Sequence, residues 1–297
     1  MLTPVYTLSF TNMSGDVHHR PHYWSRGDLR PVEKVIWMNF KDIPVAVAER
    51  IGSGTFGRVY AICQSSDSSC TMRGEFGWAM KLQLLEKNND VTDHFLVEVD
   101  RNRRAATLGV GVQMHDWDIV TVDSLPLPLQ NFGRPVKPKT LVGIMIQDRW
   151  MSDLGKVRQD WVFASKARII RRLEELISVM HANNTIHADL MPKNVLVRFS
   201  PLGEFEDLTL ADFGFAFPAS RLWQEIPGWT SERLAYYFDG SNITTARLPN
   251  TYLPLVITAQ KIHNKEPTAD PSLIADWTLQ NPFALDKLIL YHYANWR

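Results

Sequence analysis

The sequence predicts an α+β protein of two lobes, and three observations support this prediction. The chain has 297 residues, which at roughly 150 residues per domain corresponds to about two domains or lobes. Short apolar runs typical of strands fill the first half, whereas the second half shows helical periodicity. Hydrophobic residues make up 45% and charged residues 22%, as in an ordinary globular protein. We therefore divide the chain into an N-terminal extension (1–43), a small strand-rich lobe (44–150) and a helical lobe (151–297).

Four apolar runs define the strand-rich lobe. They are Val45–Ala48, Gly57–Cys63, Trp78–Leu82 and Leu141–Ile146. Between the last two, Val91–Leu108 has a helical pattern, with Asp93 as the expected N-cap. The extension before this lobe is too rich in aromatic residues for a plain disordered tail, so we expect it to pack on its own domain or on a partner.

The clearest helix of the second lobe is Ser165–Ala182. Its apolar residues recur with helical spacing at Ile169, Leu173, Leu176 and Met180. The opposite side carries charged residues, namely Arg168, Arg171, Arg172, Glu174 and Glu175. A solvated helix face explains these charges better than a nucleic-acid site does.

Composition restricts the classes of partner and compartment. The 32 basic and 32 acidic residues cancel, which argues against a dedicated nucleic-acid binder. The sequence shows no secretory signal and no run of 18 apolar residues, so we expect no membrane partner and a cytoplasmic or nuclear location. The two cysteines, Cys63 and Cys70, are too few for a disulfide framework and are expected to be free thiols.

A glycine-rich motif, G-x-G-x-x-G-x-V, spans Gly52 to Val59. Strand patterns flank it on both sides and no helix follows, so a dinucleotide-binding loop is disfavoured. A glycine-rich hairpin suits the covering of phosphates, because backbone N–H groups can approach an anion where no Cβ intrudes. A plain hairpin turn is the alternative.

Lys81 lies inside an apolar strand, where its charge is costly unless it is paired. The candidate partner is Glu98 in the following helix, with Asp100 as the nearby competitor. A lysine that extends its ammonium group to solvent is the alternative.

Two further segments carry metal-binding and acid-base residues. Asp189 is followed five residues later by Asn194, between apolar segments. Such an aspartate can deprotonate a hydroxyl, and an amide oxygen can bind a hard cation. His187 is expected to be a structural hydrogen-bonding residue. Asp212, after a short apolar strand and before Phe213 and Gly214, suits a Mg²⁺ ligand on a mobile loop.

Taken together, the four motifs resemble those of the eukaryotic-type protein kinase superfamily, in the same order and over roughly residues 45–215. The resemblance implies a two-lobed kinase-like fold with a β-rich N-lobe, a shortened helical C-lobe, and ATP with Mg²⁺ bound between the lobes. It implies catalytic roles for Asp189 as base, Lys81 and Lys193, and metal ligation by Asn194 and Asp212. The residues it implies for nucleotide binding are Gly52, Ser53, Gly54, Thr55, Gly57, Val59, Ala79, Lys81, Glu98, Gln147, Arg149 and Asp153. The segment 146–149 resembles the adenine-binding hinge, with Ile146 as gatekeeper, and Asp153 would reach the ribose.

Several departures from the family pattern shape the expected function. Ala188 replaces the arginine that usually precedes the catalytic aspartate, which predicts that a phosphorylated loop does not switch the protein on. Met191 replaces a usual lysine, so Lys193 is expected to supply that charge, and Pro192 favours a serine/threonine-protein kinase over a tyrosine kinase.

The C-terminal part matches the family poorly. Glu232 is a weak substitute for a missing acidic motif, and Asp239 and Asp276 are rival candidates for the aspartate that anchors the catalytic loop. Such short lobes resemble divergent kinases of large DNA viruses, for which the location would be host cell or virion, or those of bacterial effectors. The alternatives are a small-molecule phosphotransferase and a pseudokinase or scaffold. Protein substrates are expected, with possible docking through the extension or the aromatic segment 291–296.

Overall fold

The computed structural model describes residues 35–53, 57–64, 77–85 and 89–221, together with single positions between 258 and 290. The chain divides into two compact units: unit 1 comprises 1–106, 112–151 and 200–202, and unit 2 comprises 107–111, 152–199 and 203–297. The fold class is mixed α+β, as predicted. Within the described ranges, no helix is long and apolar enough to cross a membrane.

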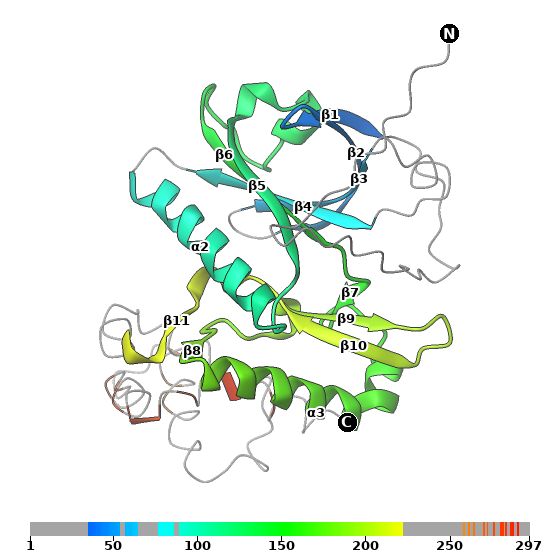
Figure 1. Ribbon diagram of the computed structural model, residues 1–297, viewed down its shortest axis with the longest axis vertical. Helices are drawn as coiled ribbons and strands as arrows, with labels where there is room; N and C mark the ends of the chain where they lie inside the picture. Colours follow the sequence, from blue (N-terminus) through cyan, green and yellow to red (C-terminus); the bar gives the residue numbers. More distant parts are fainter. Residues whose placement is uncertain are drawn as a thin grey trace. The chain divides into compact units, whose positions relative to one another are not determined.

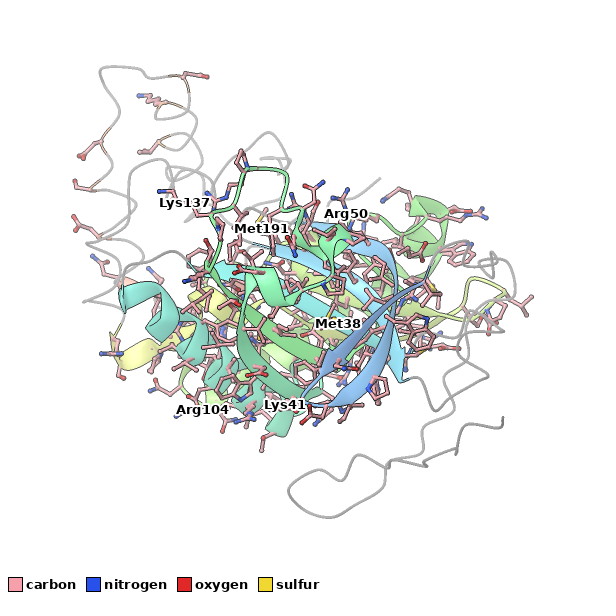
Figure 2. The ribbon with its side chains drawn as sticks, turned by 90° about the horizontal axis from the view of Figure 1, so that it is seen from above. Met38, Lys41, Arg50, Arg104, Lys137 and Met191 are labelled. Atoms are coloured by element: carbon pink, nitrogen blue, oxygen red, sulfur yellow. The ribbon has the colours of Figure 1, made fainter. Side chains whose placement is uncertain are left out.

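Unit 1 contains a six-stranded antiparallel sheet in the order β1-β2-β3-β4-β6-β5 (Figure 1). Its strands are β1 (Ile36–Phe40), β2 (Ile43–Ser53), β3 (Gly57–Gln64), β4 (Trp78–Leu85), β5 (Met114–Thr121) and β6 (Leu141–Asp148). The sheet curls until its two edges approach each other. Lys41 Nζ, in the turn after edge strand β1, lies 2.7 Å from Asp116 Oδ1 on β5, the opposite edge strand. Figure 2 looks onto this sheet from above, with Met38 on β1 and Lys41 at the turn that follows.

All four predicted runs lie within strands, but the predicted extension does not end where we placed it. Strand β1 pairs with β2 through Ile36↔Val47 to Phe40↔Ile43, so the sheet begins at Ile36. The boundary predicted at residue 43 therefore cuts through a hairpin. The rest of the predicted extension, residues 1–34, lies outside the described residues.

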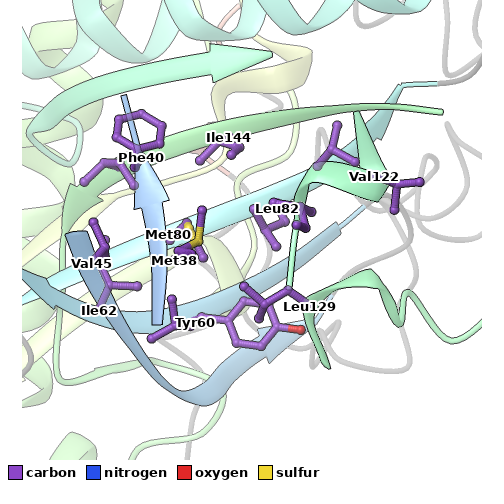
Figure 3. Packing of buried hydrophobic residues seen from close by; sticks show 14 of the residues in the cluster. Met38, Phe40, Val45, Tyr60, Ile62, Met80, Leu82, Val122, Leu129 and Ile144 are labelled. Atoms are coloured by element: carbon purple, nitrogen blue, oxygen red, sulfur yellow. The ribbon is translucent and has the colours of Figure 1, made fainter. Parts of the chain in front are cut away.

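One face of the curled sheet forms the main core of unit 1 (Figure 3). Strands β3, β4 and β6 contribute Tyr60, Ile62, Met80, Leu82, Ile144 and Ile146. The connection between β5 and β6, which contains the short 3-10 helices η1 (Val122–Ser124) and η2 (Leu127–Gln130), adds Leu125, Leu129 and Phe132. Full burial of an apolar side chain of this size contributes about 1.5–3 kcal/mol, so this connection stabilises the sheet substantially.

Helix α2 (Asn89–Thr107) packs on the other face of the sheet. Its Phe95 and Val99 are buried with Leu85, Met114 and Met145. A Cβ on Gly143 of β6 would come within 2.4 Å of the Phe95 ring, so a side chain there would push the helix away. The predicted helix is present, but it begins at Asn89, and Asp93 is an interior residue rather than the N-cap. Helix ends are poorly specified by side-chain periodicity, which marks the packed face and not the first turn.

Unit 2 contains helix α3 (Gln159–Ala182) and several short strands. The helix buries the predicted apolar stripe of Ile169, Leu173, Leu176 and Met180. Strands β7 (Ser152–Asp153), β9 (Val195–Phe199) and β10 (Phe205–Leu210) form a sheet in the order β10-β9-β7, and β8 (Thr185–Ile186) pairs with β11 (Phe217–Pro218). The described part of the second lobe is thus mixed rather than purely helical.

The cysteine prediction is wrong at Cys63, which is disulfide-bonded in β3. Cys70 lies outside the described residues. A low cysteine count argues against a framework of several disulfides. It does not determine whether a single cysteine forms a disulfide when the fold places it next to another. The thiol count therefore no longer supports a reducing compartment.

Candidate functional site

The predicted ion pair between Lys81 and Glu98 forms within unit 1. Lys81 Nζ lies 2.6 Å from Glu98 Oε1, and the two side chains are only 18% and 7% exposed. The competitor, Asp100, instead binds Arg104 at 2.9 Å in an exposed pair one helical turn apart. Because removal of one partner from a buried pair leaves an uncompensated charge, this lysine and glutamate depend on each other.

Strand register places Lys81 among the residues that the sequence assigned to nucleotide binding. Val59 pairs with Lys81, and Ala79 pairs with Gln147, so these four side chains share one face of the sheet. Ile146 points to the opposite face, where it is buried in the main core beside Met80. The prediction of Ile146 as gatekeeper is therefore wrong, because a shift of one residue along a strand moves a side chain to the other face.

The predicted hinge is also committed to hydrogen bonds within unit 1. The Asp148 N–H donates to the Gln113 carbonyl at 2.9 Å, and the Arg149 N–H donates to the Gly77 carbonyl at 3.0 Å. The Arg149 guanidinium lies 3.5 Å from Glu49. The two N–H groups are thus occupied, which leaves Gln147 as the predicted hinge residue whose side chain shares the face of Lys81.

The glycine motif divides into structurally different positions. Gly54 and Thr55 lie outside the described residues, and Ser53 pairs with Arg58 in the hairpin. A Cβ on Gly57 would lie 2.4 Å from the Leu82 carbonyl oxygen, so close packing of β3 on β4 already requires glycine there. At Gly52 a Cβ would meet only Val59 at 3.4 Å, which is ordinary contact. Sheet packing therefore explains Gly57 but not Gly52.

In unit 2, Asp189 and Asn194 are joined within the loop between β8 and β9. Asn194 Nδ2 donates to the Asp189 carbonyl at 2.7 Å and to Asp189 Oδ2 at 2.8 Å. Lys193 Nζ lies 3.9 Å from the same carboxylate and is largely exposed. Both bonds of the Asn194 side chain use its nitrogen, so its oxygen remains to accept a donor or bind a cation.

Burial raises the pKa of the Asp189 carboxyl above its ordinary value. The nearby Lys193 charge lowers this pKa, and the Asp212 charge raises it. A carboxylate whose proton affinity is increased in this way is better suited to accept a proton from a hydroxyl than an exposed aspartate is.

His187 has the structural role that the sequence predicted. It is fully buried, its Nε2 lies 3.1 Å from the Ala211 carbonyl oxygen, and its Nδ1 accepts the Asp189 N–H at 3.3 Å. With Nδ1 accepting a backbone N–H, Nε2 is the ring nitrogen that donates to the Ala211 carbonyl. The ring also lies 4.6 Å from the Phe213 ring, between centroids. His187 therefore connects the Asp189 loop to the segment around Asp212.

The residue that anchors the Asp189 loop is Asp286, which sequence analysis missed. Its Oδ2 accepts the His187 N–H at 2.9 Å and its Oδ1 accepts the Ala188 N–H at 3.1 Å. His181 Nε2 contacts Oδ2 at 3.0 Å. Ala188 has φ 60°, a left-handed conformation that these bonds help to maintain.

Neither predicted anchor takes this position in the described structure. Asp276 is exposed, and Asp239, like Glu232, lies outside the described residues. The signal for Asp286 is one acid in the segment Phe283 to Tyr291, which is otherwise apolar except for Lys287.

Asp212 and Asp153 complete the predicted set. Asp212 follows β10 with an exposed side chain in a left-handed conformation (φ 65°, ψ 61°), next to Ala211, whose N–H donates to the Asn194 carbonyl at 2.9 Å. Asp153 is nearly buried, accepts the Gly155 N–H at 3.0 Å and binds Lys156 at 2.8 Å, so it stabilises its own loop. Among the described residues, no cluster of three or more His, Cys, Asp or Glu side chains could hold a metal by itself.

No protein-family model matches this chain, and no curated protein matches it either. The structure offers two separate clusters from which function can be argued, Lys81 with Glu98 in unit 1 and Asp189 with Asn194 in unit 2.

Proposed function

We propose that this chain is a Mg²⁺- and ATP-dependent protein kinase that transfers the γ-phosphate of ATP to serine or threonine hydroxyls of protein substrates. The observation that carries the proposal is the Asp189 loop. A buried aspartate receives two hydrogen bonds from Asn194, and a second buried aspartate fixes the loop backbone. The Lys81–Glu98 pair is the independent support from the other unit.

Each of the two clusters has a distinct part in this proposal. Lys81, fixed in direction by Glu98, would bind nucleotide phosphates, and Val59, Ala79 and Gln147 on the same sheet face would contact the base. Asp189 would accept the proton of the substrate hydroxyl. The hydroxyl oxygen would attack the γ-phosphorus, and the bond between the γ-phosphorus and the β-phosphate oxygen would break. Lys193 would neutralise charge on the transferred group.

The residues present fit a Mg²⁺ ion. Asn194 keeps an amide oxygen for a cation, and Asp212 offers a carboxylate, and both are hard oxygen ligands. Magnesium in kinases takes few protein ligands and completes its shell with phosphate oxygens and water, which agrees with the lack of a larger acidic cluster among the described residues. A bound ion would neutralise phosphate charge.

The decisive experiment is transfer of labelled phosphate from ATP, with wild type beside Asp189→Asn. We expect wild type to label a basic protein or itself and the variant to lose at least about 10²-fold in rate. Equal labelling by both proteins would mean a contaminating kinase. Measured binding of Mg-ATP without transfer to any acceptor would favour a scaffold role.

A second candidate is a small-molecule phosphotransferase, which Ala188 favours because a small residue often stands near the catalytic aspartate in that class. The same assay with an aminoglycoside and with choline as acceptors separates the two. Labelling of a small alcohol with no labelling of protein would replace our proposal.

We also propose an intracellular location, cytoplasmic or nuclear, since ATP is required as a substrate. Protein substrates are the expected partners, with neither nucleic acid nor membrane involved.

A further inference from the structure

The guanidinium of Arg58 connects the start of β3 to a distant part of unit 1. Its Nη1 donates to the carbonyl of Gly57 at 3.1 Å, and its Nη2 donates to the carbonyl of Phe132 at 2.5 Å. Phe132 lies 74 residues further along the chain, in the connection between β5 and β6, and its ring is buried in the main core. Hydrogen bonds from a charged donor are stronger than those between neutral groups, so this contact ties the connection firmly to the strand.

The connection between β5 and β6 is shaped to receive this guanidinium. Gly133 has a left-handed backbone conformation (φ 77°), and the Asn131 side chain accepts its N–H at 2.9 Å. A Cβ on Gly133 would lie 2.6 Å from Arg58 Nη2. Glycine is therefore required here for two reasons, the backbone conformation and the close approach of the guanidinium.

Arg58 lies where the glycine motif joins the sheet. It pairs with Ser53 across the β2–β3 hairpin and with Leu82 of β4 on its other side. The preceding residue is Gly57, where a Cβ would meet the Leu82 carbonyl oxygen at 2.4 Å, and the Gly57 carbonyl is itself bound by Arg58. The β3 end of the hairpin is therefore held both by the sheet and by the connection.

The Arg58 side chain does not share the sheet face that the proposed function assigns to the nucleotide. Consecutive residues of a strand point to opposite faces, and Val59 shares its face with Lys81. Arg58 therefore lies on the face of the main core, where it meets Phe132. Any effect of Arg58 on nucleotide binding has to act through the backbone of the motif.

We infer that Arg58 is a positioning residue for the proposed phosphate-covering hairpin, Gly52 to Val59, and that the connection at Phe132 and Gly133 is the support through which it acts. This inference rests on the proposed function. Backbone N–H groups bind an anion best when the fold holds them in direction beforehand, because ordering them on binding costs affinity. Arg58 supplies that order from the far face of the sheet.

The test measures the affinity for Mg-ATP by nucleotide titration, and the KM for ATP and kcat by phosphate transfer, on the whole chain. Arg58→Met keeps an apolar stem and removes the guanidinium. It should weaken ATP affinity and raise the KM about tenfold while kcat changes less than about twofold. Gly133→Ala should raise the KM at least about threefold, because the new Cβ displaces the guanidinium. The double variant should match Arg58→Met within about twofold, since no guanidinium remains to be displaced.

Two matched controls separate positioning from a general loss of structure. Gly109→Ala introduces a Cβ at a similar left-handed conformation (φ 71°), but that Cβ meets nothing within 4 Å. Arg50→Met removes an exposed arginine from the neighbouring strand β2. Both should change the KM for ATP less than about twofold. Circular dichroism shows whether each variant is folded, and Gly133→Ala carries the test if Arg58→Met does not fold.

The outcomes distinguish this inference from the proposed function. Wild type that neither binds Mg-ATP nor transfers phosphate would refute the proposed function, and this role of Arg58 with it. A wild type that binds Mg-ATP, with unchanged affinity in Arg58→Met and Gly133→Ala, would refute this inference alone. Additive effects in the double variant, an equal loss in either control, or a lower melting temperature at constant ATP affinity would refute it as well. Weaker ATP binding at constant kcat, with no further loss in the double variant, supports it.

Discussion

Replacing Asp286 by asparagine should loosen the loop that carries Asp189. The native carboxylate is 1% exposed and serves two backbone N–H groups, of His187 and Ala188, with separate oxygens. An amide has one acceptor oxygen, so at least one of these donors would instead face an NH₂ group. A buried donor without an acceptor costs about 1–3 kcal/mol. Here one backbone N–H loses its acceptor, and it faces an amide hydrogen that the substitution introduces without one. We therefore expect the free energy of unfolding to fall by about 2–4 kcal/mol.

Urea denaturation followed by tryptophan fluorescence measures this loss, and phosphate-transfer kinetics measures its effect on the loop. Under the proposed function, kcat should fall at least about tenfold while the KM for ATP changes little, since Lys81 belongs to unit 1. Asp276→Asn is the control, because Asp276 is exposed. A loss below about 0.5 kcal/mol for Asp286→Asn, or an equal loss for Asp276→Asn, would refute the anchoring role of Asp286.

Three further predictions address the Lys81 cluster of unit 1, the Asp189 loop of unit 2 and the glycine motif. Glu98→Gln removes the carboxylate charge 2.6 Å from Lys81 Nζ and should raise the KM for ATP severalfold or more, which nucleotide titration measures. Asp100→Asn, from an exposed pair, should change stability by less than about 1 kcal/mol, which denaturation measures. Burial raises the pKa of the Asp189 carboxyl, so the loss of activity on acidification should begin at a higher pH than for an ordinary aspartate. The Lys193 charge lowers this pKa, so Lys193→Ala should shift the acid limb of the kcat profile to a still higher pH. An acid limb that stays in place or shifts to lower pH in Lys193→Ala would contradict this. Gly57→Ala should destabilise the sheet by more than about 1 kcal/mol, because the new Cβ would clash with the Leu82 carbonyl. Gly52→Ala should leave the melting temperature unchanged. A loss of ATP affinity in Gly52→Ala would therefore report on phosphate contact.

Much of the fold follows from the sequence where burial imposes a clear period. Helix α3 was predicted from its apolar stripe, and the central strands β3, β4 and β6 from continuous apolar runs. The edge strands β1 and β5 were missed. In β5 (Met114–Thr121) most residues are only half-buried and acids alternate with apolar residues, so the pattern lacks the apolar run of a central strand.

The candidate site was predictable only where neighbours in sequence are neighbours in space. Asp189 and Asn194 lie five residues apart in one loop, and Lys81 and Glu98 lie on adjacent elements, so spacing alone suggested both pairs. Asp286 lies 98 residues after Ala188, and no local pattern specifies which distant acid will reach that loop. The gatekeeper error at Ile146 has a different origin, since a strand pattern gives a face only after the register is known.

The backbone of the two loops argues for rigidity around Asp189. Ala188 and Asp212 both adopt left-handed conformations, which cost about 1–2 kcal/mol for a residue with a Cβ, less for aspartate than for alanine. Glycine would relieve this cost at either position but would add freedom to the loop. Alanine at position 188 is held instead by the buried Asp286, and the N–H of Ala211, just before Asp212, binds the Asn194 carbonyl. The strain is therefore balanced by hydrogen bonds that also fix Asp189 and Asn194, which is the arrangement expected where the position of a carboxylate matters more than the mobility of its loop.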